Sequence, residues 1–406
     1  MAVPLPNPTR RGRRVADSHE ITRSAFQLAG MFILGAGCWA VWRVFNPGDW
    51  WGPLHTFMIG GVLLAISGAT QLFSITWAAA IPPDRRLANV QRWLIVTGAA
   101  TVVGAATWDQ DGVLIGSAIL VGLGLVGLAW ILVGVTRRSL LGRFGLSTRF
   151  YLLAIAAGLL GVTLGAMARI GAAGSRYIDF RVSHMHLNLV GLVGFTIVGT
   201  LPTILPTMAR HTMVSGREAI VGFWFSVFAL AAMAAGAALG STTVGVGSGL
   251  AGVGAAVTLM GILLRLGIRR IAASGAPGLL VTSGSLWLIG WMITQFFVLV
   301  GGDHVVWSRI TGIGVGGIAL VLFGSLSYLI PVLAGPGSDL AGNFARMRNN
   351  QWIRFILANG TVVAVAASLA GWVGLVMAVA FVVDFGVRVA FVVLRSRPLT
   401  GRVARG

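Results

Sequence analysis

The chain has 406 residues, of which 56% are hydrophobic and 10% charged, with a mean hydropathy of +0.87 and a formal net charge of +19. This composition excludes a soluble globule with a polar surface, so the sequence predicts an all-α, polytopic membrane protein. All 30 basic residues are arginine. We attribute their charge to membrane topology and to anionic headgroups of the lipid bilayer, and we expect no nucleic-acid partner.

Twelve apolar stretches are long enough to cross a bilayer, which takes about 20 residues. In chain order they cover 24–45, 55–80, 89–107, 113–135, 149–170, 184–208, 218–240, 243–267, 278–301, 304–333, 351–371 and 373–394. No long linker interrupts this pattern. We therefore expect a basic N-terminal segment over 1–23, a single twelve-helix domain over 24–394 and a basic C-terminal segment over 395–406.

The arginines cluster before the first stretch and then at every second connection between stretches. By the positive-inside rule, both termini are expected in the cytoplasm, with the chain in a bacterial-type cytoplasmic membrane. The first apolar stretch is as long as a membrane span, which favours a span over a cleaved signal. A single cysteine, Cys38, excludes a disulfide framework and a thiolate metal cluster.

A short pattern recurs in the second and sixth stretches. Both read H-x4-G-x7-G, and the matching positions are His55, Gly60 and Gly68 in one, and His186, Gly191 and Gly199 in the other. The tenth stretch keeps a related inner end, where Pro331 follows Gly324 by seven residues, but its register leaves either Thr311 or His304 at the histidine position. The pattern predicts a threefold pseudo-repeat of four helices. The rival interpretation is a chance match in a sequence rich in glycine and alanine.

Four histidines lie at the same expected end of these stretches, namely His55, His184, His186 and His304. Neutral imidazole is a strong ligand for haem iron and for copper, so all four are candidate ligands. The alternative is that they bind water or headgroups. Residues two positions apart on a helix point about 200° away from each other around its axis. His184 and His186 therefore cannot both face one centre. Asn188 is a candidate hydrogen-bond partner for a ligand.

Two further sets of charged residues suggest roles. Arg309 follows His304 by five residues, and a guanidinium group suits the carboxylates of a haem. The alternative for Arg309 is an interfacial side chain that extends to water. Asp384 and Arg388 are one helical turn apart in the last stretch, which favours an intrahelical ion pair over a proton relay.

The twelve stretches and their histidines resemble subunit I of the haem-copper oxidase superfamily, including its NnrS-like relatives. The segments that carry the resemblance are LHTFMIGGVLLAISGATQLF, SHMHLNLVGLVGFTIVGTLPTILPTM and DHVVWSRITGIGVGGIALVLFGSLSYLIPVL. The middle segment is also similar to the membrane portion joined to some copper nitrite reductases. The resemblance implies haem binding by His55 and His304, and copper binding by His184 or His186.

The chain also departs from that family. The stretch 218–240 has no histidine pair, the sixth stretch lacks the His-Pro-Glu-Val-Tyr pattern, and the tenth has one histidine instead of two. A complete oxygen-reducing centre is therefore not expected. We expect a redox protein with at most one haem, with or without one copper. Its electron partner would be a copper reductase or a cytochrome. Its role would be electron transfer, or a part in respiration that uses nitrogen oxides or oxygen. The alternatives are a transporter for a small solute and a cofactor-free assembly partner.

Overall fold

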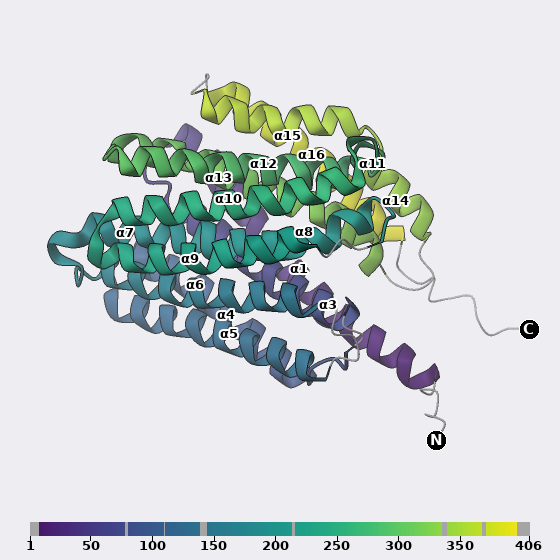
Figure 1. Ribbon diagram of the computed structural model, residues 1–406. Helices are drawn as coiled ribbons and strands as arrows, with labels where there is room; N and C mark the ends of the chain where they lie inside the picture. Colours follow the sequence, from purple (N-terminus) through teal and green to yellow (C-terminus); the bar gives the residue numbers. More distant parts are fainter. Residues whose placement is uncertain are drawn as a thin grey trace, which may run out of the picture. The chain divides into compact units, whose positions relative to one another are not determined.

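The computed structural model describes residues 8–77, 80–108, 110–138, 144–212, 216–334, 339–367 and 371–395. The side chains of 8–18, 106, 107, 304–309 and 371 lie outside this description. Within the described ranges every regular element is a helix, as the composition predicted (Figure 1). Among the described residues, ten helices are long and apolar enough to cross a membrane. The chain is therefore an all-helical protein of the polytopic membrane type.

The helices follow the expected stretches closely. In chain order they are α1 (Pro8–Phe45), α2 (Trp51–His55), η1 (Thr56–Leu63), α3 (Leu64–Trp77), α4 (Arg85–Thr107), α5 (Asp111–Arg137), α6 (Gly145–Arg169), η3 (Gly174–Arg176), α7 (Tyr177–His186), η4 (Leu187–Gly194), α8 (Phe195–Met208), α9 (Arg217–Leu239), α10 (Ser241–Leu266), α11 (Ile268–Ala273), α12 (Ala276–Val300), α13 (His304–Leu333), α14 (Leu340–Arg348), α15 (Gln351–Ala366) and α16 (Gly371–Arg395). Two of the twelve expected spans are not among the ten long apolar helices. These are α4, which carries Gln91 and Arg92, and α15, which has 16 residues.

Local sequence signals set several helix ends. The carboxylates of Asp84 and Asp339 accept backbone N–H groups in the first turns of α4 and α14, which satisfies donors that a helix start leaves free. Gly240 and Gly267 have φ values of 102° and 75° at the two ends of α10. Glycine adopts this region without the steric cost that a Cβ atom brings, so these residues end one helix and start the next.

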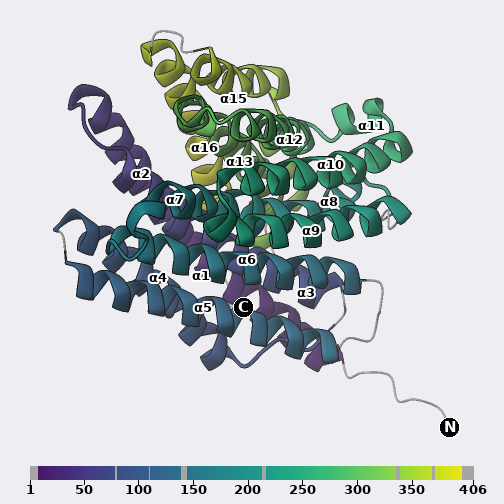
Figure 2. The ribbon, with the colours of Figure 1, turned by 60° about the vertical axis from the view of Figure 1, so that its left-hand side comes forward.

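The helices group into two compact units. One unit contains the described residues up to 201 together with 216–258 and 292–308, and the other contains 202–212, 259–291 and the described residues from 309 onward. In the first unit, α4, α5 and α6 run side by side, and α9 packs against α6 and α7 (Figures 1 and 2). In the second unit, α15 packs along α16.

Glycines allow the closest helix contacts. A Cβ atom on Gly98 would lie 3.0 Å from the backbone of α5, and one on Gly284 would lie 2.6 Å from a backbone oxygen of α13. Both distances are shorter than ordinary van der Waals contact. In a membrane, where lipid tails are as apolar as leucine, such close backbone packing is a main source of helix association.

The two H-x4-G-x7-G segments share an unusual backbone. In each, an α-helix ends at the histidine, an eight-residue π-helix follows, and an α-helix resumes. A Cβ atom on Gly60 would overlap Phe32 of α1, and one on Gly191 would overlap Ala157 of α6. The first glycine of the pattern thus lets the wide turn approach the helix before it. Turns of this kind are frequent at functional sites.

Candidate functional site

His55 is fixed by its own helix. It ends α2, directly before the π-helix η1, and its Nδ1 lies 2.8 Å from the backbone oxygen of Trp51, one turn earlier. Since a carbonyl oxygen only accepts hydrogen bonds, Nδ1 carries the proton of the neutral ring and the lone pair is on Nε2. The indole of Trp51 stacks on the imidazole, with ring centroids 4.0 Å apart and planes 20° apart. The ring is therefore held in both position and tautomer.

His184 is fixed by a neighbouring helix. Its Nδ1 lies 2.7 Å from the backbone oxygen of Gly161 in α6, which again puts the proton on Nδ1 and the lone pair on Nε2. The amide of Asn188, one turn later, donates to the backbone oxygen of His184 at 2.8 Å and lies 3.3 Å from Nδ1. Asn188 therefore contacts His184, and its role beside a ligand stays a prediction.

The structure brings His55 and His184 together. Their ring centroids are 6.2 Å apart and their planes are 9° from parallel. Both rings are partly exposed, and the Nε2 atom of each has no hydrogen bond to a described residue. The pair therefore consists of two neutral imidazoles, one from α2 and one from α7. The Nε2 lone pair of each ring is available to bind a metal ion.

Two glycines of α6 make room for this arrangement. A Cβ atom on Gly165 would lie 2.3 Å from Nδ1 of His184, and one on Gly161 would lie 2.5 Å from the amide of Asn188. Any larger residue at either position would push these side chains away. Neither the role of these two glycines nor the stacking of Trp51 was predicted from the sequence. The available signal was the spacing of the glycines, four residues apart on one face of α6.

His186 is placed differently. Its side chain is fully buried and its Nδ1 lies 2.9 Å from the backbone oxygen of Val182, one turn earlier, as Nδ1 of His55 does with Trp51. It therefore matches His55 in local bonding, while its near neighbour His184 makes the contact with the ring of His55. His304 begins α13. The structure describes the backbone of His304 and Arg309 but not their side chains. Their predicted roles stay predictions.

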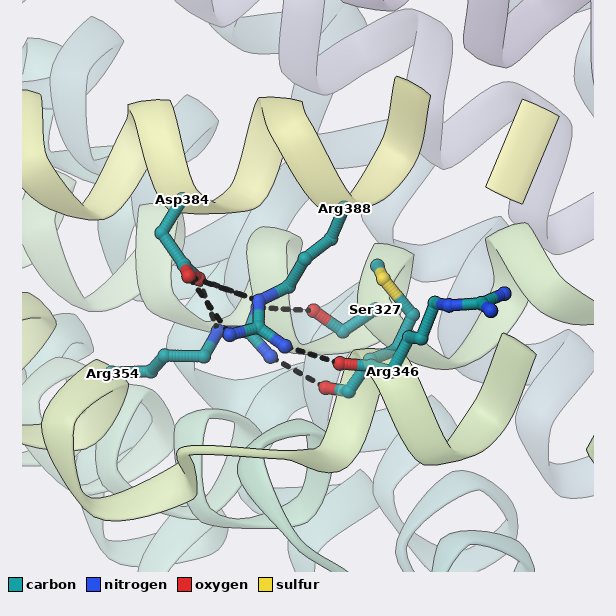
Figure 3. Close-up of polar contacts among 6 residues, drawn as sticks. Ser327, Arg346, Arg354, Asp384 and Arg388 are labelled. Atoms are coloured by element: carbon teal, nitrogen blue, oxygen red, sulfur yellow. Dashed lines mark hydrogen bonds and ion pairs between the residues drawn. The ribbon is translucent and has the colours of Figure 1, made fainter. Parts of the chain in front are cut away.

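A second polar group lies in the other unit, where the carboxylate of Asp384 faces two guanidinium groups (Figure 3). Arg388, on the same helix, donates to both carboxylate oxygens from Nε at 3.0 and 2.9 Å, which confirms the intrahelical pair. Arg354 of α15 is fully buried and its Nε lies 3.1 Å from Asp384. It also donates to Ser327 of α13 and to the backbone of Met347. We interpret this group as a tie between helices, because its hydrogen bonds and ion pairs join α13, α15 and α16.

The described residues limit the chemistry of the site. Among them, no three His, Cys, Asp or Glu side chains gather closely enough to hold a metal ion. The described residues thus bring together the two imidazoles of His55 and His184 and no larger group of these donors. No protein-family model matches the chain, and no curated protein is significantly similar to it. The fold and the site together define a polytopic, all-helical membrane protein with a paired-imidazole site.

Proposed function

We propose that this protein is a membrane redox protein in which His55 and His184 hold a haem or a copper ion. The observation that carries the proposal is the pair itself, in which two neutral rings from different helices have their Nδ1 protons bound to backbone oxygens. Ligating histidines in proteins are oriented in this way, with the second ring nitrogen donating to a carbonyl or carboxylate. A haem or a copper ion, when bound, would accept and donate one electron.

The donors of the pair would suit either group. The rings of His55 and His184 lie nearly parallel, with centroids 6.2 Å apart, and each ring offers one neutral imidazole nitrogen. Imidazole is a ligand both for haem iron and for copper. Two imidazoles without further donors would favour haem, because Cu(II) ordinarily needs additional ligands.

The fold is part of the same proposal. We infer a threefold pseudo-repeat of four helices and twelve spans, with α4 and α15 as the two less apolar members. The shared order of α-helix, histidine and π-helix at His55 and His186 supports an internal repeat, and both rings bond the carbonyl one turn earlier. A copper reductase or a cytochrome would be the electron partner, at the outer face that the arginine pattern assigns to the histidines.

A reduced-minus-oxidised visible spectrum with iron and copper analysis of the detergent-purified protein tests the proposal. We expect stoichiometric iron with a Soret band, or stoichiometric copper, in the wild type. His55→Ala and His184→Ala should each lose most of the bound metal, since either change removes one of two protein ligands. His211→Ala is the matched control, because this histidine lies in the connection after α8 and bonds its neighbour Thr212.

The outcome distinguishes the alternatives. Metal content unchanged in both His55→Ala and His184→Ala would refute the proposed site. Loss in His186→Ala alone would move it to the other histidine of α7. Solute uptake by vesicles that contain the metal-free protein would favour a transporter, and co-purification with a reductase without haem or copper would favour an assembly partner.

A further inference from the structure

A groove lies between α1 and α4 in the first unit, away from the histidine pair. It has a volume of about 590 Å³ and is lined by Ser24, Gln27, Leu28, Met31, Arg92 and Trp93. This volume is within the range of about 300–1,000 Å³ that is typical of small-ligand sites. The residues from α1 are spaced by three and four positions, so they share one face of that helix. The groove therefore follows the helix axis over about two turns.

The groove has a polar end and an apolar end. Ser24, Gln27 and Arg92 supply the polar groups, and Arg92 bonds the hydroxyl of Ser24 at 2.7 Å. Met31, seven residues after Ser24 and thus about 10 Å further along α1, is 68% exposed, and Trp93 is 54% exposed. The site thus has the amphipathic character of a lipid, with a polar group at one end and apolar surface along the rest.

Arg92 is a buried cation whose described partners are all neutral. Arg92 is only 8% exposed. Nη1 donates to the backbone oxygen of Ile21 and to Ser24, and Nη2 donates to Asn89. Its Nε is buried and has no hydrogen-bond acceptor among the described residues. Burying a guanidinium group without a counter-charge is costly, so the arrangement calls for an anion in the groove.

We propose that this groove binds an anionic phospholipid, with its phosphate at Arg92 and an acyl chain along Leu28, Met31 and Trp93. The phosphate supplies the negative charge that the described partners of Arg92 lack, and arginine is a favoured partner of phosphate groups. The acyl chain covers apolar side chains that the protein leaves uncovered. A free inorganic phosphate would satisfy the arginine but would leave the apolar end of the groove bare.

Native mass spectrometry of the detergent-purified full chain tests the site. The protein is titrated with phosphatidylglycerol and, separately, with phosphatidylcholine of the same acyl chains. We expect about fivefold tighter retention of phosphatidylglycerol by the wild type, as one arginine near an anionic headgroup gives. Arg92→Gln should remove this preference, and Arg92→Lys should keep it, since lysine preserves the charge.

Arg86→Gln is the matched control, because it removes the same charge from an exposed position of the same helix that does not line the groove. It should leave the preference unchanged. Leu28→Trp leaves every arginine in place and fills the apolar end, so it should weaken retention of both lipids. Equal retention of the two lipids by the wild type, or equal losses in Arg92→Gln and Arg86→Gln, would overturn the proposal. Binding of inorganic phosphate with the same dependence on Arg92, without lipid retention, would replace the lipid by a free anion.

Discussion

Gly165→Ala offers a sharp test of how α6 supports the histidine pair. The new methyl group would lie 2.3 Å from Nδ1 and 2.4 Å from Cε1 of His184. Ordinary van der Waals contact begins at 3.4 Å, so the imidazole or the helix must move by about 1 Å. Such a movement of the ring also breaks the 2.7 Å hydrogen bond from His184 to the backbone oxygen of Gly161.

The expected cost follows from these two effects. Overpacking costs about 1–3 kcal/mol, and the lost hydrogen bond costs about 0.5–1.5 kcal/mol. The gain in helix propensity from glycine to alanine offsets about 1 kcal/mol. Gly116→Ala in α5 is the matched control, because a Cβ atom there meets nothing within 4 Å. Since both changes gain the same propensity, the difference between the two variants should be about 1.5–4.5 kcal/mol.

Equilibrium unfolding in mixed detergent micelles measures this difference directly, and the metal content of each purified variant reports on the site. We expect Gly165→Ala to be the less stable variant and to hold less metal, with Gly116→Ala at or above the stability of the wild type. A difference below about 0.5 kcal/mol, the usual scatter of surface substitutions, would refute the packing argument. Equal stability with reduced metal would show that the ring moves freely within the site.

Three further substitutions test the polar contacts that join helices within each unit. Asp384→Asn removes the carboxylate that faces the fully buried Arg354, so we expect a loss of about 3 kcal/mol in the free energy of unfolding. Glu20→Gln, which breaks the exposed pair with Arg85, should change it by less than about 1 kcal/mol in the same assay. Gln91→Leu removes the buried amide that bonds groups of α3 and α5, and we expect a loss of about 1–3 kcal/mol. A thermal midpoint within 1 °C of the wild type for Gln91→Leu would contradict that estimate.

The sequence was sufficient to predict the helical fold class and the approximate positions of the helices. Hydrophobic run length reports directly on whether a segment can cross a bilayer, because each residue of a helix advances by a fixed rise. Ten of the expected spans correspond to long apolar helices in the part of the chain that the structure describes. The intrahelical pair of Asp384 and Arg388 was also predictable, since residues four apart on a helix lie on one face whatever surrounds them.

The structure decided what long-range packing controls. The sequence left open which histidine of α7 would face the centre, and only the packing of α6 and α7 places the ring of His184 beside that of His55. In the same way, no local pattern pairs Arg354 with Asp384, which lies 30 residues later. Local periodicity fixes which face of its own helix a residue occupies. The contact it makes there depends on how neighbouring helices are rotated, and glycines such as Gly165 set that rotation through contacts distant in sequence.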